Sequence, residues 1–201
     1  TVNTGLNIWA LPGGFLIWVA VFFLLPRPTR TYVLGHELTH AMWAIMMGGR
    51  VGRIKVGRKG GHVELTKSNF IITLAPYFFP FYTVLVVTAY YLAGHWVRVD
   101  DDRVWWLAAI GLTWSFHITF TIHMLTQQQP DVQEHGRIFS FTVIYIMNVL
   151  VIALLMILLS DARLLKFGDM LGHEAAVAYR HTCQILERIR LAAAQALERL
   201  I

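Results

Sequence analysis

The sequence predicts an all-α polytopic membrane protein, and three observations support this fold class: an apolar composition, few charged residues, and long apolar runs. Hydrophobic residues make up 56% of the 201 residues and charged residues 14%, whereas a soluble domain carries about 25% charged residues. A helix needs about 20 mostly apolar residues to cross a bilayer. Five runs approach or reach that length, so we expect about five transmembrane helices surrounded by lipid.

The five expected membrane segments follow one another through the first 160 residues, which we expect to form one transmembrane domain. They cover residues 8–25, 32–47, 70–93, 104–125 and 138–159. The proline-rich link "PRPTR", 26–30, predicts that the first two segments are antiparallel neighbours. We therefore expect an integral, multi-pass protein of a cell membrane, either a plasma membrane or an inner membrane.

The stretch 48–68 differs from the apolar segments on both sides. It is basic and glycine-rich, and its two short runs "RVGRIKV" and "HVELT" are separated by Gly57, Gly60 and Gly61. Alternating runs interrupted by glycine are typical of a hairpin. We expect a small β-hairpin directly after the second apolar segment.

Residues 161–201 form the second expected domain, a C-terminal tail that ends in an amphipathic helix. Apolar residues recur in it at a helical spacing, with charged residues between them. The apolar positions are Leu186, Ile189, Ala193, Ala196, Leu197 and Leu200. Such a helix lies on a membrane surface or packs against a partner, and both alternatives stay open.

Charge and cysteine content exclude some classes of function. The formal net charge is +5, but the basic residues cluster between apolar runs, where they can contact anionic lipid headgroups. We find no nucleic-acid-binding motif and expect no nucleic-acid partner. Cys183 is the only cysteine, so an intrachain disulfide is impossible and a cysteine-ligated metal site is not expected.

The second apolar segment contains "HELTH", which places His36, Glu37 and His40 close together. On a helix, residues four apart project about 40° from each other, so both imidazoles can bind one zinc ion. Glu37 can then take a proton from a water molecule activated by the ion and pass it to a leaving amine. Ionisable residues are costly inside a membrane and are usually functional there, which favours a metal site.

A catalytic zinc ion usually has three protein ligands, so one ligand must come from elsewhere in the chain. Asp131 is the first candidate, because it follows Pro130 in a polar stretch just before the fifth apolar segment. The alternatives are His117 and His123 in the fourth segment, either as ligands or hydrogen-bonded to ligands, and Glu134.

These motifs resemble the site-2 protease family of intramembrane zinc metallopeptidases, in the form of a small member without a PDZ domain. The resemblance lies in "GHELTHAMWAIMMGGRVGRIKVG", in "LAPYFFP" at 74–80, and in "QPDVQEHG" at 129–136. It implies a metal-binding motif inside a membrane helix, a β-like segment near the active site, and an aspartate ligand further along. The sequence lacks the Leu-Asp-Gly triplet that is common around that aspartate.

We therefore expect an intramembrane zinc endopeptidase with one Zn²⁺ ion, Glu37 as catalytic base, and His36, His40 and Asp131 as ligands. Its substrate would be a membrane protein or peptide, and a regulatory membrane partner is possible. The strand residues Gly61, His62, Val63 and Glu64 could pair with an unwound substrate.

Two other functions stay open. One is a non-proteolytic membrane scaffold or partner subunit that retains a metal site. The other is a different class of HExxH membrane protease, with Glu134 as the third ligand.

Overall fold

The computed structural model describes residues 4–57, 60–96, 102–159 and 164–198. The chain divides into two compact units, residues 1–149 and 150–201, and the division falls inside helix α7. The candidate site lies in the first unit.

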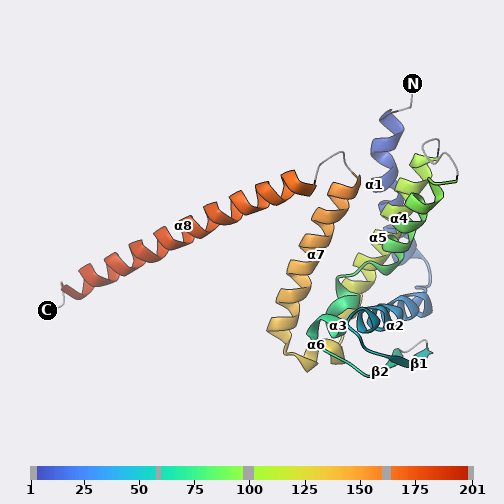
Figure 1. The fold of residues 1–201 in the computed structure, drawn as a ribbon, viewed down its shortest axis with the longest axis horizontal. Coiled ribbons are helices and arrows are strands. Elements are labelled where there is room, and N and C mark those ends of the chain that lie inside the picture. The colour runs from blue at the N-terminus through green and yellow to red at the C-terminus, as the bar shows by residue number, and fades with distance from the viewer. Residues whose placement is uncertain (1–3, 58–59, 97–101, 160–163, 199–201) are drawn as a thin grey trace. The chain divides into compact units, whose positions relative to one another are not determined.

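The described part of the chain is mostly helical and contains one antiparallel hairpin. Its long helices are α1 (Thr4–Leu24), α2 (Thr29–Met46), α4 (Phe81–Ala93), α5 (Arg103–Leu125), α7 (Arg137–Leu159) and α8 (Leu164–Glu198). The short elements are α3 (Phe70–Leu74), the 3₁₀ helix η1 (Ala75–Tyr77), α6 (Pro130–Glu134), β1 (Val51–Val56) and β2 (Gly61–Leu65). Figure 1 shows α2, α3, α6 and the hairpin gathered at one end of the first unit.

Helices α1 and α5 form the most extensive contact between two elements of the first unit. Two glycines allow their backbones to touch. A Cβ atom on Gly14 would overlap the carbonyl group of Ala108, and one on Gly111 would overlap that of Leu11. Small residues at a helix contact are typical of membrane helices, because close backbone approach maximises van der Waals packing.

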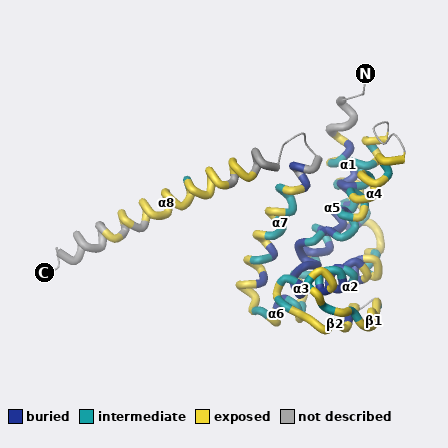
Figure 2. Tube along the Cα trace, in the orientation of Figure 1, coloured by how far each residue is buried: buried dark blue, intermediate teal, exposed yellow. Residues whose placement is uncertain are grey.

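An aromatic cluster joins α2 to this helix pair. The Trp18 indole donates a hydrogen bond to the Thr119 hydroxyl at 2.9 Å. The ring of Tyr32, near the start of α2, stacks on Phe120 with centroids 4.7 Å apart. Figure 2 shows that buried residues concentrate where the helices meet, whereas the hairpin is largely exposed. The N-terminal half of α2 is therefore fixed by packing from α1 and α5.

The hairpin expected at 48–68 is confirmed. Strands β1 and β2 pair antiparallel, with Ile54 opposite Val63 and Val56 opposite Gly61. Among the strands of the described chain β2 pairs only with β1, so its second edge has no strand partner. Val63 is the one buried residue of β2.

The segment expected as one helix over 70–93 is interrupted, and this corrects the sequence prediction. Helices α3 and η1 end before Pro80, and α4 continues after a bend of 79°. Pro76 and Pro80 cannot donate the backbone hydrogen bonds that a continuous helix needs. Asn69 caps the first piece, since its side-chain oxygen accepts a hydrogen bond from the Ile72 amide at 2.9 Å.

Two described helices, α5 and α7, are each long and apolar enough to cross a membrane. If each of two bent helix pairs also counts as one span, the described chain has up to four spans. The expected number of five therefore stays a prediction. The bent pairs are α1 with α2, at 120°, and α3–η1 with α4. The expectation that the first two segments are antiparallel neighbours is wrong, because α1 packs mainly on α5 and α2 turns across the end of that pair.

The second unit contains the end of α7 and the long helix α8. A helix in the C-terminal tail is thus confirmed, with bounds Leu164–Glu198. The expected domain boundary was residue 160, whereas the compact unit begins at residue 150. The apolar side chains on which the amphipathic character depends lie outside the described residues, so that character stays a prediction.

Candidate metal centre

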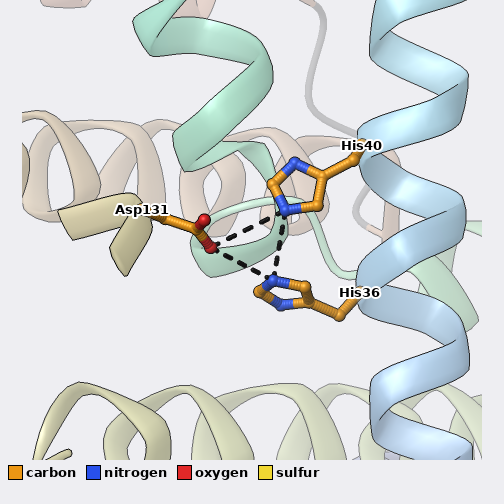
Figure 3. A group of neighbouring side chains, drawn as sticks. All are labelled: His36, His40 and Asp131. Carbon is orange, nitrogen blue, oxygen red and sulfur yellow. Dashed lines mark hydrogen bonds and ion pairs between the residues drawn. The ribbon is translucent and has the colours of Figure 1, made fainter. Parts of the chain in front are cut away.

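Helix α2 carries the first two candidate ligands on one face. His36 and His40 lie one helical turn apart, and both side chains point from α2 toward Asp131 (Figure 3). Their Nε2 atoms are 3.2 Å apart. Both side chains are largely shielded from solvent, with 11% and 9% of the side-chain surface exposed.

Asp131 reaches this face from the short helix α6. Pro130 occupies the beginning of α6, where a missing backbone N–H costs nothing because the first amides of a helix have no intrahelical partner. Val132, the residue after Asp131, is buried against the α3–η1 segment and α7, and its carbonyl accepts a hydrogen bond from the Ser140 hydroxyl at 3.0 Å. These contacts hold α6 so that Asp131 faces α2.

The three ligand atoms have a spacing that suits one metal ion. Asp131 Oδ2 lies 3.3 Å from His36 Nε2 and 3.7 Å from His40 Nε2. Two ligands about 2.0–2.1 Å from a zinc ion at tetrahedral angles lie about 3.3 Å from each other. His36, His40 and Asp131 therefore lie close enough to hold a metal ion. Asp131 lies beside the two histidines as expected, and its role as a zinc ligand stays a prediction.

Hydrogen bonds on the outer ring nitrogens leave the inner ones available. His40 Nδ1 lies 2.9 Å from the Ile72 carbonyl oxygen. A carbonyl only accepts, so Nδ1 carries the proton and the neutral ring presents a lone pair at Nε2. The Tyr32 hydroxyl lies 3.4 Å from His36 Nδ1 in the corresponding position. Capping of α3 by Asn69 is thus linked to the site, because α3 carries the Ile72 carbonyl.

The electrostatic surroundings keep Asp131 ionised. Burial raises the pKa of the carboxyl, but hydrogen bonding to a protonated His36 or His40 outweighs it and holds that pKa below its usual range. Loss of that imidazole proton leaves an Nε2 lone pair for an ion beside the ionised carboxylate. Tyr77 also donates a hydrogen bond to Asp131 Oδ2, at 2.9 Å. Tyr77 is not among the residues predicted from the sequence, although it lies within the "LAPYFFP" stretch that carries part of the family resemblance.

A cleft of about 850 Å³ opens in front of the three ligands. Glu37 lines it beside them, and β2 forms one wall through Gly61, His62, Val63 and Glu64. The β2 backbone lies directly on Glu37, since a Cβ atom at Gly61 would be 2.6 Å from Glu37 Oε1. Gln127, Gln128 and Gln129 line the cleft as well.

The other candidate ligands lie apart from the three converging groups. His117 is buried, and its Nε2 atom has no hydrogen-bond partner among the residues that the structure describes. It lines a small cavity of about 20 Å³ that also touches His36 and Tyr32.

His123 and Glu134 have other neighbours. His123 Nε2 lies 3.2 Å from Arg27 Nη1, so it joins the end of α5 to the α1–α2 link. Glu134 lines the cleft, and its Oε1 lies 3.8 Å from His135 Nε2. Like His117, these two residues lie outside the group of described residues that could hold an ion.

Comparisons with protein-family models, with curated proteins and with solved structures found no match to this chain.

Proposed function

We propose that this protein is an intramembrane zinc endopeptidase of the site-2 protease type, which hydrolyses peptide bonds of membrane-embedded proteins. One observation carries the proposal: the Nε2 atoms of His36 and His40 converge with Asp131 Oδ2 at the wall of a cleft that Glu37 also lines. Two imidazoles and one carboxylate are a common donor set for a catalytic zinc ion, which keeps a fourth position for water or substrate.

A zinc ion held by these three residues would supply Lewis-acid polarisation of the scissile carbonyl and ease deprotonation of the attacking water. Glu37 follows His36 directly on α2 and is not one of the three converging groups, so its carboxylate can act as base. It takes the water proton as the water oxygen bonds to the carbonyl carbon. It then returns that proton to the amide nitrogen as the carbon–nitrogen bond breaks.

The shape of the cleft favours an extended peptide as substrate. A peptide bond within a helix already has its carbonyl hydrogen-bonded and surrounded by side chains, so the substrate helix has to unwind locally. The unpaired edge of β2 can take up such a segment by strand addition. The glutamines of the α5–α6 loop stand at the same cleft, and their side chains can donate to and accept from a peptide backbone.

The apolar helices support the membrane part of the proposal. Large apolar side chains are exposed along α1 and α7, including Phe23 at 72%, Ile138 at 87% and Tyr145 at 71%. Exposed apolar surface on this scale suits contact with lipid. We infer an integral multi-pass protein of a plasma or inner membrane, with a membrane protein or peptide as substrate and with room for a regulatory membrane partner.

The test is cleavage by purified protein in liposomes that contain a library of single-span peptides, with cleavage products detected by mass spectrometry. Wild-type protein with one bound zinc ion should cleave, and Glu37→Gln should bind zinc equally while cleaving about 10²–10⁴-fold more slowly. Glu174→Gln, the same change at an exposed position of α8, should cleave at the wild-type rate. Glu37→Gln protein that cleaves as fast as wild type would contradict the proposed role of Glu37 as the base. Zinc binding without any cleavage would favour the scaffold function.

A further inference from the structure

Tyr77 contacts the candidate metal centre from behind. It lies on η1 and its side chain is fully buried. Its hydroxyl donates to Asp131 Oδ2 at 2.9 Å, and this is the carboxylate oxygen that faces both histidines. The hydroxyl is therefore bonded to the atom that would contact the ion.

The position of Tyr77 is itself fixed from several sides. Its backbone carbonyl accepts a hydrogen bond from the Asn148 side chain of α7 at 2.9 Å. Its ring meets the His36 ring edge to face, with centroids 5.3 Å apart and planes at 85°. It belongs to the buried cluster that contains Val132, the residue after Asp131. Tyr77 thus contacts both elements that carry ligands.

Asp131 needs such a contact more than the histidines do. The histidines project from an 18-residue helix, whereas Asp131 projects from a helix of five residues. A carboxylate can also rotate to present either oxygen. A donor fixed on Oδ2 selects one oxygen and one rotation. Because a carboxylate oxygen has two lone pairs, Oδ2 can accept this bond and still bind an ion.

We propose that Tyr77 is a positioning residue that orients Asp131 as the third metal ligand. This inference rests on the proposed zinc site, but it does not depend on proteolysis. Hydrogen-bond partners of metal ligands contribute about 10–100-fold to metal affinity. Tyr77→Phe keeps the ring and removes only the hydroxyl, so it should weaken zinc binding by about that factor.

The experiment measures the zinc dissociation constant by chelator competition, and the visible absorption spectrum of the Co²⁺-loaded protein, in detergent or nanodiscs. Tyr77→Phe should weaken zinc binding and shift the cobalt bands, because the carboxylate changes its orientation. Tyr82→Phe is the matched control. It also loses a tyrosine hydroxyl hydrogen bond, in this case to the Thr31 carbonyl at 2.6 Å, and should keep the wild-type affinity and spectrum.

A double-mutant cycle separates positioning from general destabilisation. In an Asp131→Ala background, Tyr77→Phe should cause no further loss of zinc affinity, because its target is gone. An equal loss in both backgrounds would overturn the proposal, as would a Tyr77→Phe protein with wild-type affinity and spectrum.

If Tyr77→Phe fails to fold, 3-fluorotyrosine at position 77 provides the second variant. It keeps the hydroxyl and the packing but makes the hydroxyl a stronger donor. A shifted cobalt spectrum would then support the proposal, and an unchanged spectrum would overturn it.

The outcome for Tyr77 can be separated from the outcome for the protease. Wild-type protein that binds zinc and cleaves nothing would overturn the proposed activity, while a weakened affinity in Tyr77→Phe would still support the positioning role. Wild-type protein that binds no zinc would overturn both.

Discussion

The α1–α5 pair and the metal-site end of the first unit are held together in different ways. The helix pair depends on backbone contact at Gly14 and Gly111, where no side-chain atom fits. The site end consists of short elements joined by individual polar contacts, such as Tyr77 to Asp131 and Ile72 to His40. The first region is held by close backbone packing, whereas in the second individual hydrogen bonds orient the site residues against a buried apolar cluster.

Stability and function should therefore be separable in this protein. An atom added at a close packing contact lowers the free energy of unfolding, because the neighbouring backbone has to move. The polar contacts each fix one group, so their loss should alter the site with less effect on the helical unit. Substitutions in each region can test this separation.

Asp131→Ala should lower zinc affinity by more than about 100-fold, since it removes a ligand rather than a ligand's hydrogen-bond partner, and should abolish cleavage. Elemental analysis and chelator competition measure the zinc. Glu134→Ala, which removes the rival carboxylate three residues on, should bind zinc as wild type does. The reverse pattern would make Glu134 the third ligand.

Gly61→Val should slow cleavage by about 10²–10⁴-fold, the size of a lost general base, with zinc still bound. The added side chain would overlap Glu37 and Val33, so the carboxylate must move. In Gly52→Val, on the neighbouring strand, the added side chain overlaps Glu64 instead. Its rate of cleavage should fall less than that of Gly61→Val. The kinetics are measured in liposomes alongside zinc content. Equal cleavage by the two variants would break the link between β2 and Glu37.

Gly14→Ala should lower the free energy of unfolding by about 1–3 kcal/mol, the usual cost of overpacking. The adjacent Gly13→Ala is the control, because a Cβ atom there meets nothing within 4 Å. Thermal melting in detergent compares the two variants. Folded Gly14→Ala protein should bind zinc normally. A weakened zinc affinity in the folded fraction would mean that the two regions are coupled.

Asn69→Ala should lower stability by about 1 kcal/mol, because α3 loses its cap. It should also weaken zinc binding slightly, since α3 carries the Ile72 carbonyl that orients His40. Asn69→Asp retains a capping oxygen and should restore both properties. Thermal melting measures the stability and chelator competition measures the zinc affinity. If Asn69→Asp restored neither property, loss of the helix cap would not be the cause of the Asn69→Ala effects.

The sequence contains enough information to predict the three candidate ligands but not the residues that hold them in place. His36 and His40 follow from helical spacing. Asp131 follows from its place after Pro130 and before an apolar run, where a carboxylate can face inward. Tyr77 has no such signal, because its partner is 54 residues away and nothing local distinguishes it from the aromatic residues beside it.

The fold shows the same limit. The hairpin was predictable from its glycines and alternating runs. The break within 70–93 was signalled by Pro76 and Pro80, but the apolar composition of the whole stretch favoured one continuous helix. The turn of α2 away from α1 depends on long-range contacts with α5 and the hairpin, which no local pattern records.

Strand β2 is only five residues long, and this has a consequence for turnover under the proposed function. Alternate residues of a strand face each edge, so two or three residues of β2 could pair with a substrate, through about five hydrogen bonds. Each hydrogen bond contributes about 1 kcal/mol net, so strand pairing contributes only a modest binding free energy. A cleaved segment keeps only part of that pairing, so both products can leave quickly. A longer strand would bind the substrate better and retain the product, so lengthening the hairpin should shift the slow step from bond cleavage to product release.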